Sequence, residues 1–391
     1  MKLTIKKETL EKAVKHICRV INDKAALPIL SNILCEVDPD PDSKSIKLTG
    51  SDSEVWLTMT LILESAEGGG RFCVSAWSLM EALQSLSDQP ITIIADIENE
   101  NPHFELQHAT GRTYFPIENA DEYPVQQDLE DIITMSMPAE ELARAISVTS
   151  FAATVNDELR PIMNGICFDT NNERTDIVAS NDHVLMRYRI KQDYGVTGNF
   201  VLPRKVANIL PKMLTWAYED DAWIEWNDRS GRVEQNADLY DWVLTFRLID
   251  GKYPNYESVI PKDAPFWVTA DRSQLINSIR KVAPFTPDAS NMIIARFKGA
   301  ELTIDGEDAD FGTGATDMMA VEPCDNMPES LTIGLKASSI ISILSKMPYD
   351  NILIRMTDPS RAVTFEEKPV PGTKCKMLGD ITGLSMPMIY E

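Results

Sequence analysis

The chain has 391 residues, with 37 basic and 60 acidic side chains and a formal net charge of −23. Its apolar content of 43% is that of a globular protein, and the length predicts about two to four domains, each with its own core. No apolar run approaches the roughly 20 residues that a membrane span needs. The acidic balance, if the charge is evenly spread, argues against nucleic-acid binding.

The first elements expected along the chain are a strand and then a helix, in MKLTIKKETLEKAV (1–14), with no apolar signal segment. The six cysteines are scattered without a C-x-x-C pair, and five of them lie in or beside apolar runs. Such thiols are typical of reduced side chains that fill a core. We therefore expect a cytoplasmic protein.

The strand-to-helix pattern of the N-terminus recurs twice further along the chain. The three copies are LTIKKETLEKAVKHI from Leu3, MSMPAEELARAISVT from Met135 and VTADRSQLINSIRKV from Val268. A second helix recurs in the same phase in each copy. The six expected helices lie at 7–21, 75–86, 138–149, 203–216, 271–283 and 336–347.

Short strand-like stretches bounded by Asn, Asp and Gly lie between and after these helices, as in antiparallel meanders. The chain is therefore predicted to be three copies of one α+β unit. The expected domains are 1–126, 133–260 and 266–391, separated by polar or proline-rich linkers at 127–131 and 261–265. The copies share little sequence, so chance similarity is the alternative, but two separate helices keep their phase in all three.

The expected helices carry a net charge of +7, which leaves −30 on the rest of the chain. On the first helix, three cations at i, i+3 and i+7 face away from an apolar stripe. Solvated helix faces are one explanation, but basic helices in an acidic protein favour sequence-independent contact with a phosphate backbone. The candidate residues are Lys12, Lys15, Arg19, Arg204, Lys205, Lys212, Arg280 and Lys281.

Several longer motifs occur in order along the chain. They are LPILSNIL (27–34), LRPIMNGI (159–166), ASNDHVLMRY (179–188), FRLIDGKYPNYESVIP (246–261) and the terminal MPM (386–388). With these motifs the whole chain resembles the bacterial DNA polymerase III beta subunit, the sliding clamp. The resemblance implies a processivity factor for DNA replication that encircles duplex DNA and has no catalytic activity or cofactor. It also implies a head-to-tail homodimeric ring of six similar domains, with helices lining the hole and sheets outside.

The helix count agrees with a ring of two chains. Twelve helices of about 10 Å diameter, set side by side, give a circumference of about 120 Å and a bore of about 30 Å, which is wide enough for a duplex. Six helices from one chain would leave only about 10 Å. Closure would also pair sheet edges that are otherwise prone to aggregation.

The resemblance adds two sets of site residues. The family's DNA contacts match Lys24 and Asn156. A pocket that binds short peptide motifs of the polymerase alpha subunit, the clamp loader delta subunit and repair or other polymerases is also implied. Its matching positions are Ser180, Asp182, His183, Val184, Leu185, Pro254, Val259, Val363, Leu384, Met386, Pro387 and Met388.

The apolar tail ITGLSMPMIYE (381–391) is expected to be a last strand whose pairing ends at Pro387, which lacks an N–H to donate. Met386 and Met388 would then lie at the sheet edge and face the ASNDHVL segment. Three positions depart from the family pattern. Asp182 and Val184 flank His183 where the family usually shows Gly-His-Arg, and Ser258 stands where arginine is common. We therefore expect an altered preference among client motifs.

Two other classes of function are alternatives to a clamp: an enzyme and an acidic interaction scaffold. An enzyme is disfavoured because Asn181-Asp182-His183 comes without a nucleophile elbow, a metal-spaced cluster or a phosphate loop, and the glycines at 68–70 lack a following Lys-Ser/Thr. An acidic scaffold that never meets DNA is the second alternative. Salt-dependent retention on circular duplex, with escape after linearisation, separates a clamp from such a scaffold.

Overall fold

The structure is a computed structural model that describes residues 1–22, 25, 27–40, 43–97, 101–214, 221–237, 240–368 and 379–390. The chain forms two compact units. The first joins Met1–Ala143 with Asn208–Leu248, and the second joins Arg144–Ala207 with Ile249–Glu391. The middle third of the sequence therefore contributes to both.

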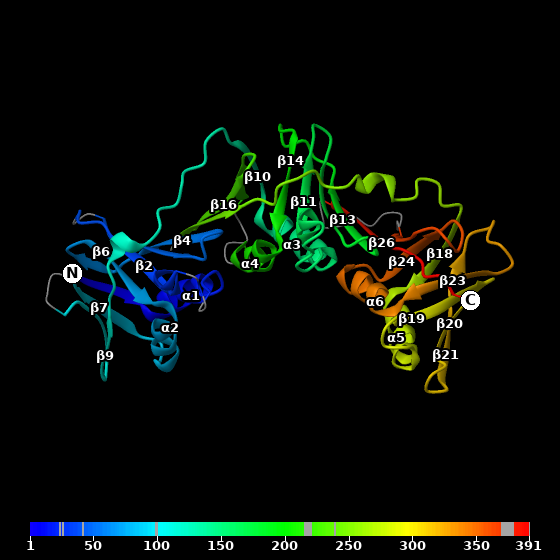
Figure 1. The fold of residues 1–391 in the computed structure, drawn as a ribbon, viewed down its shortest axis with the longest axis horizontal. Coiled ribbons are helices and arrows are strands. Elements are labelled where there is room, and N and C mark those ends of the chain that lie inside the picture. The colour runs from blue at the N-terminus through cyan, green and yellow to red at the C-terminus, as the bar shows by residue number, and fades with distance from the viewer. Residues whose placement is uncertain are drawn as a thin grey trace. The chain divides into compact units, whose positions relative to one another are not determined.

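The first unit contains two antiparallel sheets (Figure 1). The five-stranded sheet has the order β5 (Ser65–Glu67), β1 (Lys2–Lys6), β7 (Pro90–Asp96), β8 (His103–His108), β9 (Gly111–Pro116). The eight-stranded sheet has the order β10 (Ile133–Pro138), β15 (Asp221–Trp226), β16 (Ser230–Ala237), β17 (Tyr240–Arg247), β4 (Val55–Ile62), β3 (Ser45–Ser51), β2 (Asn32–Val37), β6 (Gly70–Ser75).

Strands far apart in the sequence meet in the eight-stranded sheet. β17 pairs with β4 in a register that sets Leu244 opposite Leu57 and Phe246 opposite Val55. All four of these side chains are buried. The first third of the chain and part of the middle third thus share one sheet and its core.

Helices α1 (Lys7–Ile17) and α2 (Ala76–Ser85) pack against each other in the first unit (Figure 1). α1 buries Leu10, Val14 and Ile17 and exposes Lys12 and Lys15, as its amphipathic pattern predicts. The helix lies close to β3, because a Cβ on Gly50 would be only 2.3 Å from Cγ2 of Ile17.

The second unit also has two antiparallel sheets. The nine-stranded sheet has the order β14 (Gly198–Pro203), β11 (Gly165–Thr170), β12 (Thr175–Ser180), β13 (Val184–Ile190), β26 (Gly379–Ser385), β25 (Val363–Glu367), β24 (Asn351–Met356), β18 (Phe266–Asp271), β22 (Glu322–Pro323). The four-stranded sheet has the order β21 (Thr313–Ala320), β20 (Glu301–Asp308), β19 (Met292–Lys298), β23 (Leu331–Lys336).

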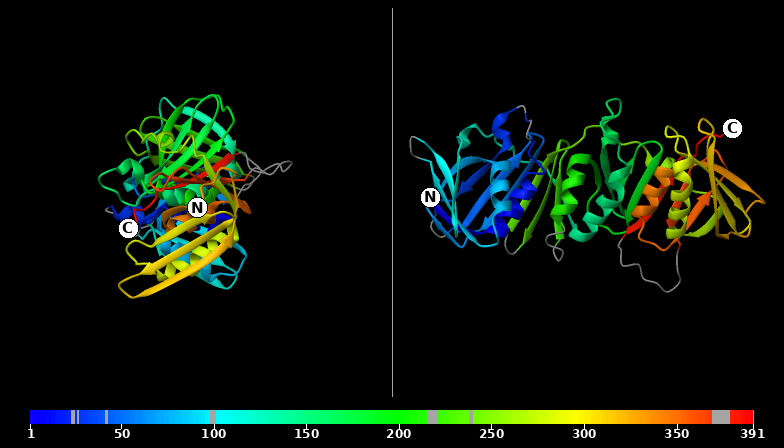
Figure 2. Two further views of the ribbon diagram at one scale, coloured as in Figure 1. Left: turned by 90° about the vertical axis from the view of Figure 1, so that its right-hand side faces the viewer. Right: turned by 90° about the horizontal axis from the view of Figure 1, so that it is seen from below.

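Helices α5 (Arg272–Val282) and α6 (Ala337–Lys346) pack against each other in this unit, and α5 covers β20 and β21. The left view of Figure 2 shows the four-stranded sheet, in yellow, with helices behind it. Asp271 caps α5, because its Oδ1 accepts a hydrogen bond from the backbone N–H of Gln274 at 2.7 Å.

Helices α3 (Ala139–Thr149) and α4 (Arg204–Leu214) each begin in one unit and end in the other. Six short 3₁₀ helices complete the described elements: η1 (Pro28–Ser31), η2 (Ala120–Glu122), η3 (Ser150–Ala152), η4 (Pro161–Asn164), η5 (Tyr256–Ser258) and η6 (Ala283–Phe285). Within the described ranges, no helix combines the length and apolar character that crossing a bilayer requires.

The α+β fold with antiparallel sheets is confirmed, and all six expected helices are present within a few residues of their expected bounds. One helical assignment is wrong. α1 ends at Ile17, and Arg19 lies in the following turn, where its N–H donates to the carbonyl of His16 at 3.0 Å. Lys12 and Lys15 therefore lie on the exposed face of α1 as predicted, whereas Arg19 does not belong to the helix.

The cysteines are the core-filling thiols that the sequence predicts. Five of them, all within the described residues, are free and buried: Cys18, Cys35, Cys73, Cys167 and Cys324. Burial raises the pKa of the Cys18 thiol to about 11 and that of Cys73 to about 12. These thiols therefore stay protonated and unreactive at neutral pH.

Candidate functional site

Cations of α1 and α4 gather in the first unit around a buried histidine. The pKa of His16 is lowered to about 4, first by burial and then by the charges of Arg19, Lys15 and Lys212. Burial is therefore the main cause of the neutral imidazole, and the charges of Lys15 on α1, Arg19 in the turn after it and Lys212 on α4 add to it. The structure therefore brings together three of the basic residues that the sequence singles out.

Lys12 lies on the exposed face of α1 beside this group. Its Nζ is 2.5 Å from Oε1 of Glu8, one helical turn away. The ion pair lowers the pKa of the Glu8 carboxyl, chiefly through the hydrogen bond from Lys12. Exposed i,i+4 pairs of this kind are weak, so Lys12 can exchange Glu8 for a phosphate.

Arg204, at the start of α4, is engaged by the protein itself. Its Nη1 donates hydrogen bonds to the carbonyl oxygens of Ala153, at 2.6 Å, and Thr154, at 3.2 Å. The loop that it holds carries Asn156, which is exposed and has a φ of 53°. Arg204 thus acts on this loop and Asn156 faces solvent, whereas Lys205 and Lys212 lie exposed on α4.

The same loop is fixed from its other end by Asn164. Oδ1 of Asn164 accepts hydrogen bonds from Oγ1 of Thr154, at 2.6 Å, and from the N–H of Asp157, at 2.9 Å. Its Nδ2 donates to the carbonyl of Asp157 at 3.0 Å. Asn164, the asparagine of the Asn-Gly dipeptide in LRPIMNGI, therefore holds the two ends of the 154–157 segment together.

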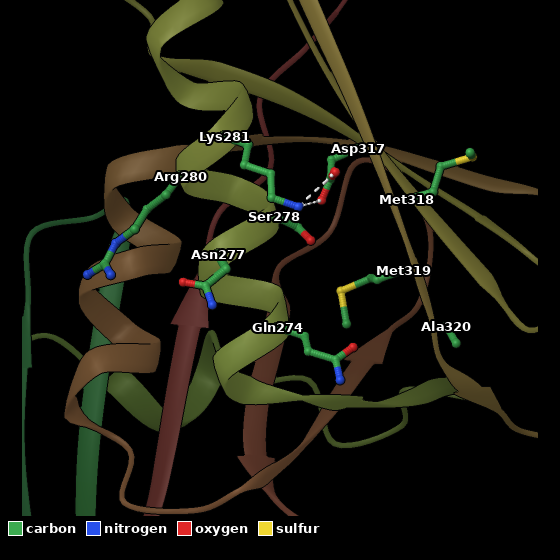
Figure 3. A pocket seen from close by; sticks show the side chains of 9 residues that line it. All are labelled: Gln274, Asn277, Ser278, Arg280, Lys281, Asp317, Met318, Met319 and Ala320. Atoms are coloured by element: carbon green, nitrogen blue, oxygen red, sulfur yellow. Dashed lines mark hydrogen bonds and ion pairs between the residues drawn. The ribbon is translucent and has the colours of Figure 1, made fainter.

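The basic pair of α5 lies beside a pocket of about 720 Å³ between α5 and β21. Figure 3 shows Lys281 turned toward Asp317 and Arg280 pointing away from the pocket. Nζ of Lys281 lies 3.0 Å from both carboxylate oxygens of Asp317. The hydrogen bond from Ser278 and then that from Lys281 lower the pKa of Asp317. Lys24, the remaining predicted DNA contact, lies outside the described residues.

The predicted peptide-binding residues of the second unit begin with a tight turn between β12 and β13. Oδ1 of Asn181 accepts hydrogen bonds from the N–H groups of His183, at 3.1 Å, and Val184, at 2.8 Å. The hydroxyl of Ser180 donates to the carbonyl of Val184 at 3.0 Å. This turn exposes Asp182 and His183 and buries Val184.

The C-terminal strand runs directly beside this turn. β26 pairs with β13 so that Leu384 lies opposite Leu185, and the N–H of Met386 donates to the carbonyl of His183 at 2.8 Å. β25 lies on the other side of β26, with Val363 opposite Ser385. The turn between β12 and β13 thus meets two C-terminal strands that are far from it in the sequence.

An apolar cluster underlies this place. It consists of Val178, Leu185, Tyr256, Ala362 and Leu384, with Tyr253 and Ile260 packed against it. The predicted residues Leu185, Val363 and Leu384 are buried and form the floor. Accessible apolar surface comes from Val259, which is 48% exposed, and Met386, which is 38% exposed. Pro254 is also exposed.

A buried polar network fastens η5, and with it Pro254 and Val259, to the sheet. The hydroxyl of Tyr256 lies 2.5 Å from a carboxylate oxygen of Asp169 and 2.8 Å from one of Asp176. Burial, followed by the hydrogen bond to Asp169, raises the pKa of Tyr256. Its phenol is therefore a neutral donor shared between two carboxylates.

Arginines complete the network. Arg189 binds Asp176 with two hydrogen bonds, of 2.7 Å from Nε and 2.6 Å from Nη2, and also pairs with Glu257 of η5. These bonds raise the pKa of Arg189. Arg174 approaches Asp176 to 3.0 Å. Since Asp176 has no exposed surface, its charge depends on these partners.

The tail beyond Ser385 behaves only partly as expected. β26 does end at Ser385, before Pro387. Met388, however, forms a further bridge, because its N–H donates to the carbonyl of Gly334 in β23 at 2.8 Å. Tyr390 follows, and its hydroxyl donates to the carbonyl of Thr332 at 3.1 Å. Proline interrupts the ladder of one sheet, and the chain then reaches the edge of another.

Sequence reasoning missed Arg160 and Leu159. Arg160 forms ion pairs with Asp157 and with Asp182 of the β12–β13 turn. Leu159 is 93% exposed. Both belong to the motif LRPIMNGI, so the signal was present, but loop residues lack the periodicity from which a face can be assigned.

In the part of the chain that the structure describes, no three His, Cys, Asp or Glu side chains are grouped to hold a metal ion.

The sequence matches two family models, for the N-terminal domain of the DNA polymerase III beta subunit over residues 1–127 and for its central domain over 136–255. The beta sliding clamp of Pseudomonas aeruginosa is 26% identical over 371 residues, which cover 94% of this chain and 96% of that protein. The beta sliding clamp of Haemophilus influenzae is 24% identical, with the same coverage.

Solved structures agree in fold. The DNA polymerase III subunit beta of P. aeruginosa superposes with a TM-score of 0.89 at 24% identity, over 100% of both chains. The beta subunit of Thermotoga maritima does so with a TM-score of 0.87 at 18% identity, again over 100% of both chains. With both family models matched in order along the sequence, and with the fold of these structures, the chain belongs to the DNA polymerase III beta subunit family.

Proposed function

We propose that this chain is a DNA sliding clamp, a processivity factor without catalysis of its own that encircles duplex DNA and holds a polymerase on it. The observation that carries the proposal is the repeated order of elements. In each third of the chain a strand leads into a helix (α1, α3, α5), and a second strand later leads into another (α2, α4, α6). Two chains then supply twelve helices, enough to line a hole that admits a duplex.

The domain division at 1–126, 133–260 and 266–391 is part of this proposal. The same repeated order of elements supports it. In a head-to-tail dimer, the outer domains of two such chains meet and close the ring. A ring that is closed in this way has its sheets on the outside and its helices around the hole.

The proposed DNA contacts are cations that act without reading bases. The best-supported group consists of Lys12 and Lys15 on α1, Arg19 in the turn after α1, and Lys212 on α4. Three of them, Lys15, Arg19 and Lys212, are near enough to His16 to lower its pKa. Lys205, Arg280, Lys281, Lys24 and Asn156 are assigned with them. Arg204 supports the loop of Asn156 and contributes positive charge from there. Contacts of this kind are salt-sensitive and sequence-independent.

The proposed client site is the apolar cluster of β12, β13, η5 and β26 together with the exposed Val259 and Met386. Short motifs of the polymerase alpha subunit, the clamp loader delta subunit and repair polymerases would place leucine or phenylalanine side chains there. Each such side chain contributes about 1.5–3 kcal/mol when it is fully buried. Two anchors contribute about 3–6 kcal/mol in all, which is less than the roughly 8 kcal/mol of micromolar binding, so the backbone and flanking residues of the motif supply the rest. Binding of this modest strength lets partners exchange. A cytoplasmic location stays a prediction.

The test of the clamp function is topological. Labelled protein is loaded with a clamp loader onto nicked circular duplex and passed over a sizing column in high salt. A clamp stays with the circle and is lost after the circle is cut by a restriction enzyme. Protein that leaves the circle and the cut DNA equally would contradict encirclement. Multi-angle light scattering at micromolar concentration is the companion test, since a monomer would contradict the ring.

A further inference from the structure

A charged pair lies at the edge of the proposed client site. Nη1 of Arg160 pairs with a carboxylate oxygen of Asp182, and its Nη2 lies 3.3 Å from Oδ2 of Asp157. About half of the side-chain surface of Arg160 and of Asp182 is exposed. The pair therefore joins the loop before η4 to the turn between β12 and β13 at a position open to a ligand.

Hydrogen bonds fix the backbone around both aspartates and hold the carboxylate of Asp157. Oδ1 of Asp157 accepts hydrogen bonds from the N–H groups of Leu159, at 3.0 Å, and Arg160, at 2.9 Å. Asp182 has a φ of 69°, in the left-handed region that glycine adopts most easily, and its N–H donates to the hydroxyl of Ser180 at 3.3 Å. Asp182 therefore carries a side chain at a position where the backbone conformation favours glycine.

Arg160 is already shared by two carboxylates. Its pKa is raised, first by the hydrogen bond to Asp182, and the pKa of Asp157 is lowered, first by the hydrogen bond from the backbone N–H of Arg160. The guanidinium contacts these two carboxylates, and with the exposed Glu158 of the same loop the four side chains carry a net charge of −2. An acidic residue of a ligand would find no unpaired cation among these four side chains.

The group adjoins the apolar surface that a client would use. Asp182 precedes His183, whose carbonyl accepts the N–H of Met386. Leu159, next to Arg160, is 93% exposed. A peptide anchored on the apolar cluster thus passes a negative rim.

We infer that Asp182 sets the charge preference of the client site, so that peptides with a lysine or arginine beside their apolar anchors bind more tightly than peptides with an aspartate or glutamate there. This inference rests on the proposed client site. A rim charge acts mainly through long-range attraction and is partly screened, so the preference is modest. We expect about a fivefold difference in Kd between otherwise identical peptides, in line with other half-exposed ion pairs.

The experiment uses two fluorescent peptides with the same leucine and phenylalanine anchors that differ at one intervening residue, lysine or aspartate. Their Kd values are measured by anisotropy with the full-length protein in low and moderate salt. The variant Asp182→Asn keeps the shape of the side chain, and asparagine tolerates the left-handed backbone. Asp325→Asn is the matched control, since Asp325 is an exposed aspartate in a different loop of the same unit.

The wild type and the control should prefer the lysine peptide about fivefold, and salt should reduce this ratio. In Asp182→Asn the ratio should fall toward one. Arg160→Gln should change it in the opposite direction, because Asp157 and Asp182 lose their shared cation. Equal ratios in wild type and Asp182→Asn, or a wild-type preference for the aspartate peptide, would overturn the inference while leaving the client site intact. Failure of both peptides to bind the wild type would reject the client site, and the inference with it.

Discussion

The N–H of Met386 donates a hydrogen bond to the carbonyl oxygen of His183 at 2.8 Å, across 203 residues of sequence. This bond continues the pairing of β26 with β13 by one residue beyond the last ladder pair, Ser385 with Val184. It ties the tail to the turn that carries Asp182. The proposed client site therefore depends on the pairing of two strands that are far apart in the sequence.

Deleting residues 386–391 should abolish binding of client peptides, because Met386 supplies accessible apolar surface and orders the turn at His183. The deletion also removes four hydrogen bonds: those donated by the N–H groups of Met386 and Met388, by the hydroxyl of Tyr390, and by the hydroxyl of Ser385 to the carbonyl of Met386. At about 0.5–1.5 kcal/mol each, we expect a loss of roughly 2–6 kcal/mol in the free energy of unfolding. Anisotropy and urea denaturation measure the two effects. Tyr390→Phe, which loses one hydrogen bond, is the control, and undiminished peptide binding by the truncated protein would show that the tail is only a strand end.

Gly334→Val should release the end of the tail from β23. A Cβ at this position would lie 2.6 Å from the carbonyl oxygen of Met388 and 3.2 Å from the ring of Tyr390, so the bridge cannot persist. We expect faster amide exchange and faster carboxypeptidase digestion at 388–390, with β26 still protected. Gly111→Val is the comparison, because a Cβ on this exposed glycine would meet only ordinary van der Waals contacts, with the ring of His108 at 3.5 Å. Unchanged protection of Met388 in Gly334→Val would contradict the bridge.

Tyr256→Phe should destabilise the second unit and loosen η5. The change removes the donor shared by Asp169 and Asp176 and leaves a buried carboxylate with one partner fewer. Leaving such a group under-satisfied costs about 1–3 kcal/mol, which chemical denaturation can measure. Tyr114→Phe alters a tyrosine that is 70% exposed and should change stability little. Equal effects of the two changes would mean that the network does not hold η5.

The free energy of unfolding should decrease as the pH is lowered from 6.5 to about 4, because of His16. Its pKa in the folded chain is about 4, below the ordinary value of 6.5, so the unfolded chain binds the extra proton between these values. The contribution is complete above pH 6.5 and is lost as pH falls toward 4. A shift of this size corresponds to at most about 3 kcal/mol. His16→Gln should flatten this part of the pH profile of unfolding free energy, whereas His183→Gln, at an exposed site, should not. An unaltered profile in His16→Gln would count against the buried neutral imidazole.

Replacing Lys12, Lys15 and Lys212 with alanine should weaken retention on DNA. Each lost phosphate contact reduces the slope of log K against log salt concentration by about 0.9, so the slope should fall by up to about 2.7. Salt titrations of binding to short linear duplex, on which a ring is not held topologically, measure the slope. The control triple Lys2→Ala, Lys47→Ala and Lys298→Ala removes the same charge at other exposed lysines. If both triples change the slope equally, net charge and not the group around His16 governs the contact.

The six helices could be placed from sequence because their signals are local. Apolar residues recur with a helical period inside each helix, as Leu10, Val14 and Ile17 do in α1, and each helix starts where a short alternating strand ends. Apolar and charged faces follow from spacing alone, as Leu10 and Lys15 on α1 illustrate. The resemblance to a known family supplied the client-site positions, none of which stands out by periodicity.

Only the tertiary structure decided which strands share a sheet. β17 pairs with β4, and β26 pairs with β13. Strands with matching apolar faces can pair across any distance in sequence, and no local pattern identifies the partner. Only the tertiary structure likewise shows which partners a charged side chain binds. Arg204 is bound to two carbonyls and Arg160 to Asp182, although both are simple loop or helix cations in sequence. A charge is recognisable from its residue type, but whether it faces a ligand or a neighbour depends on the distances that folding creates.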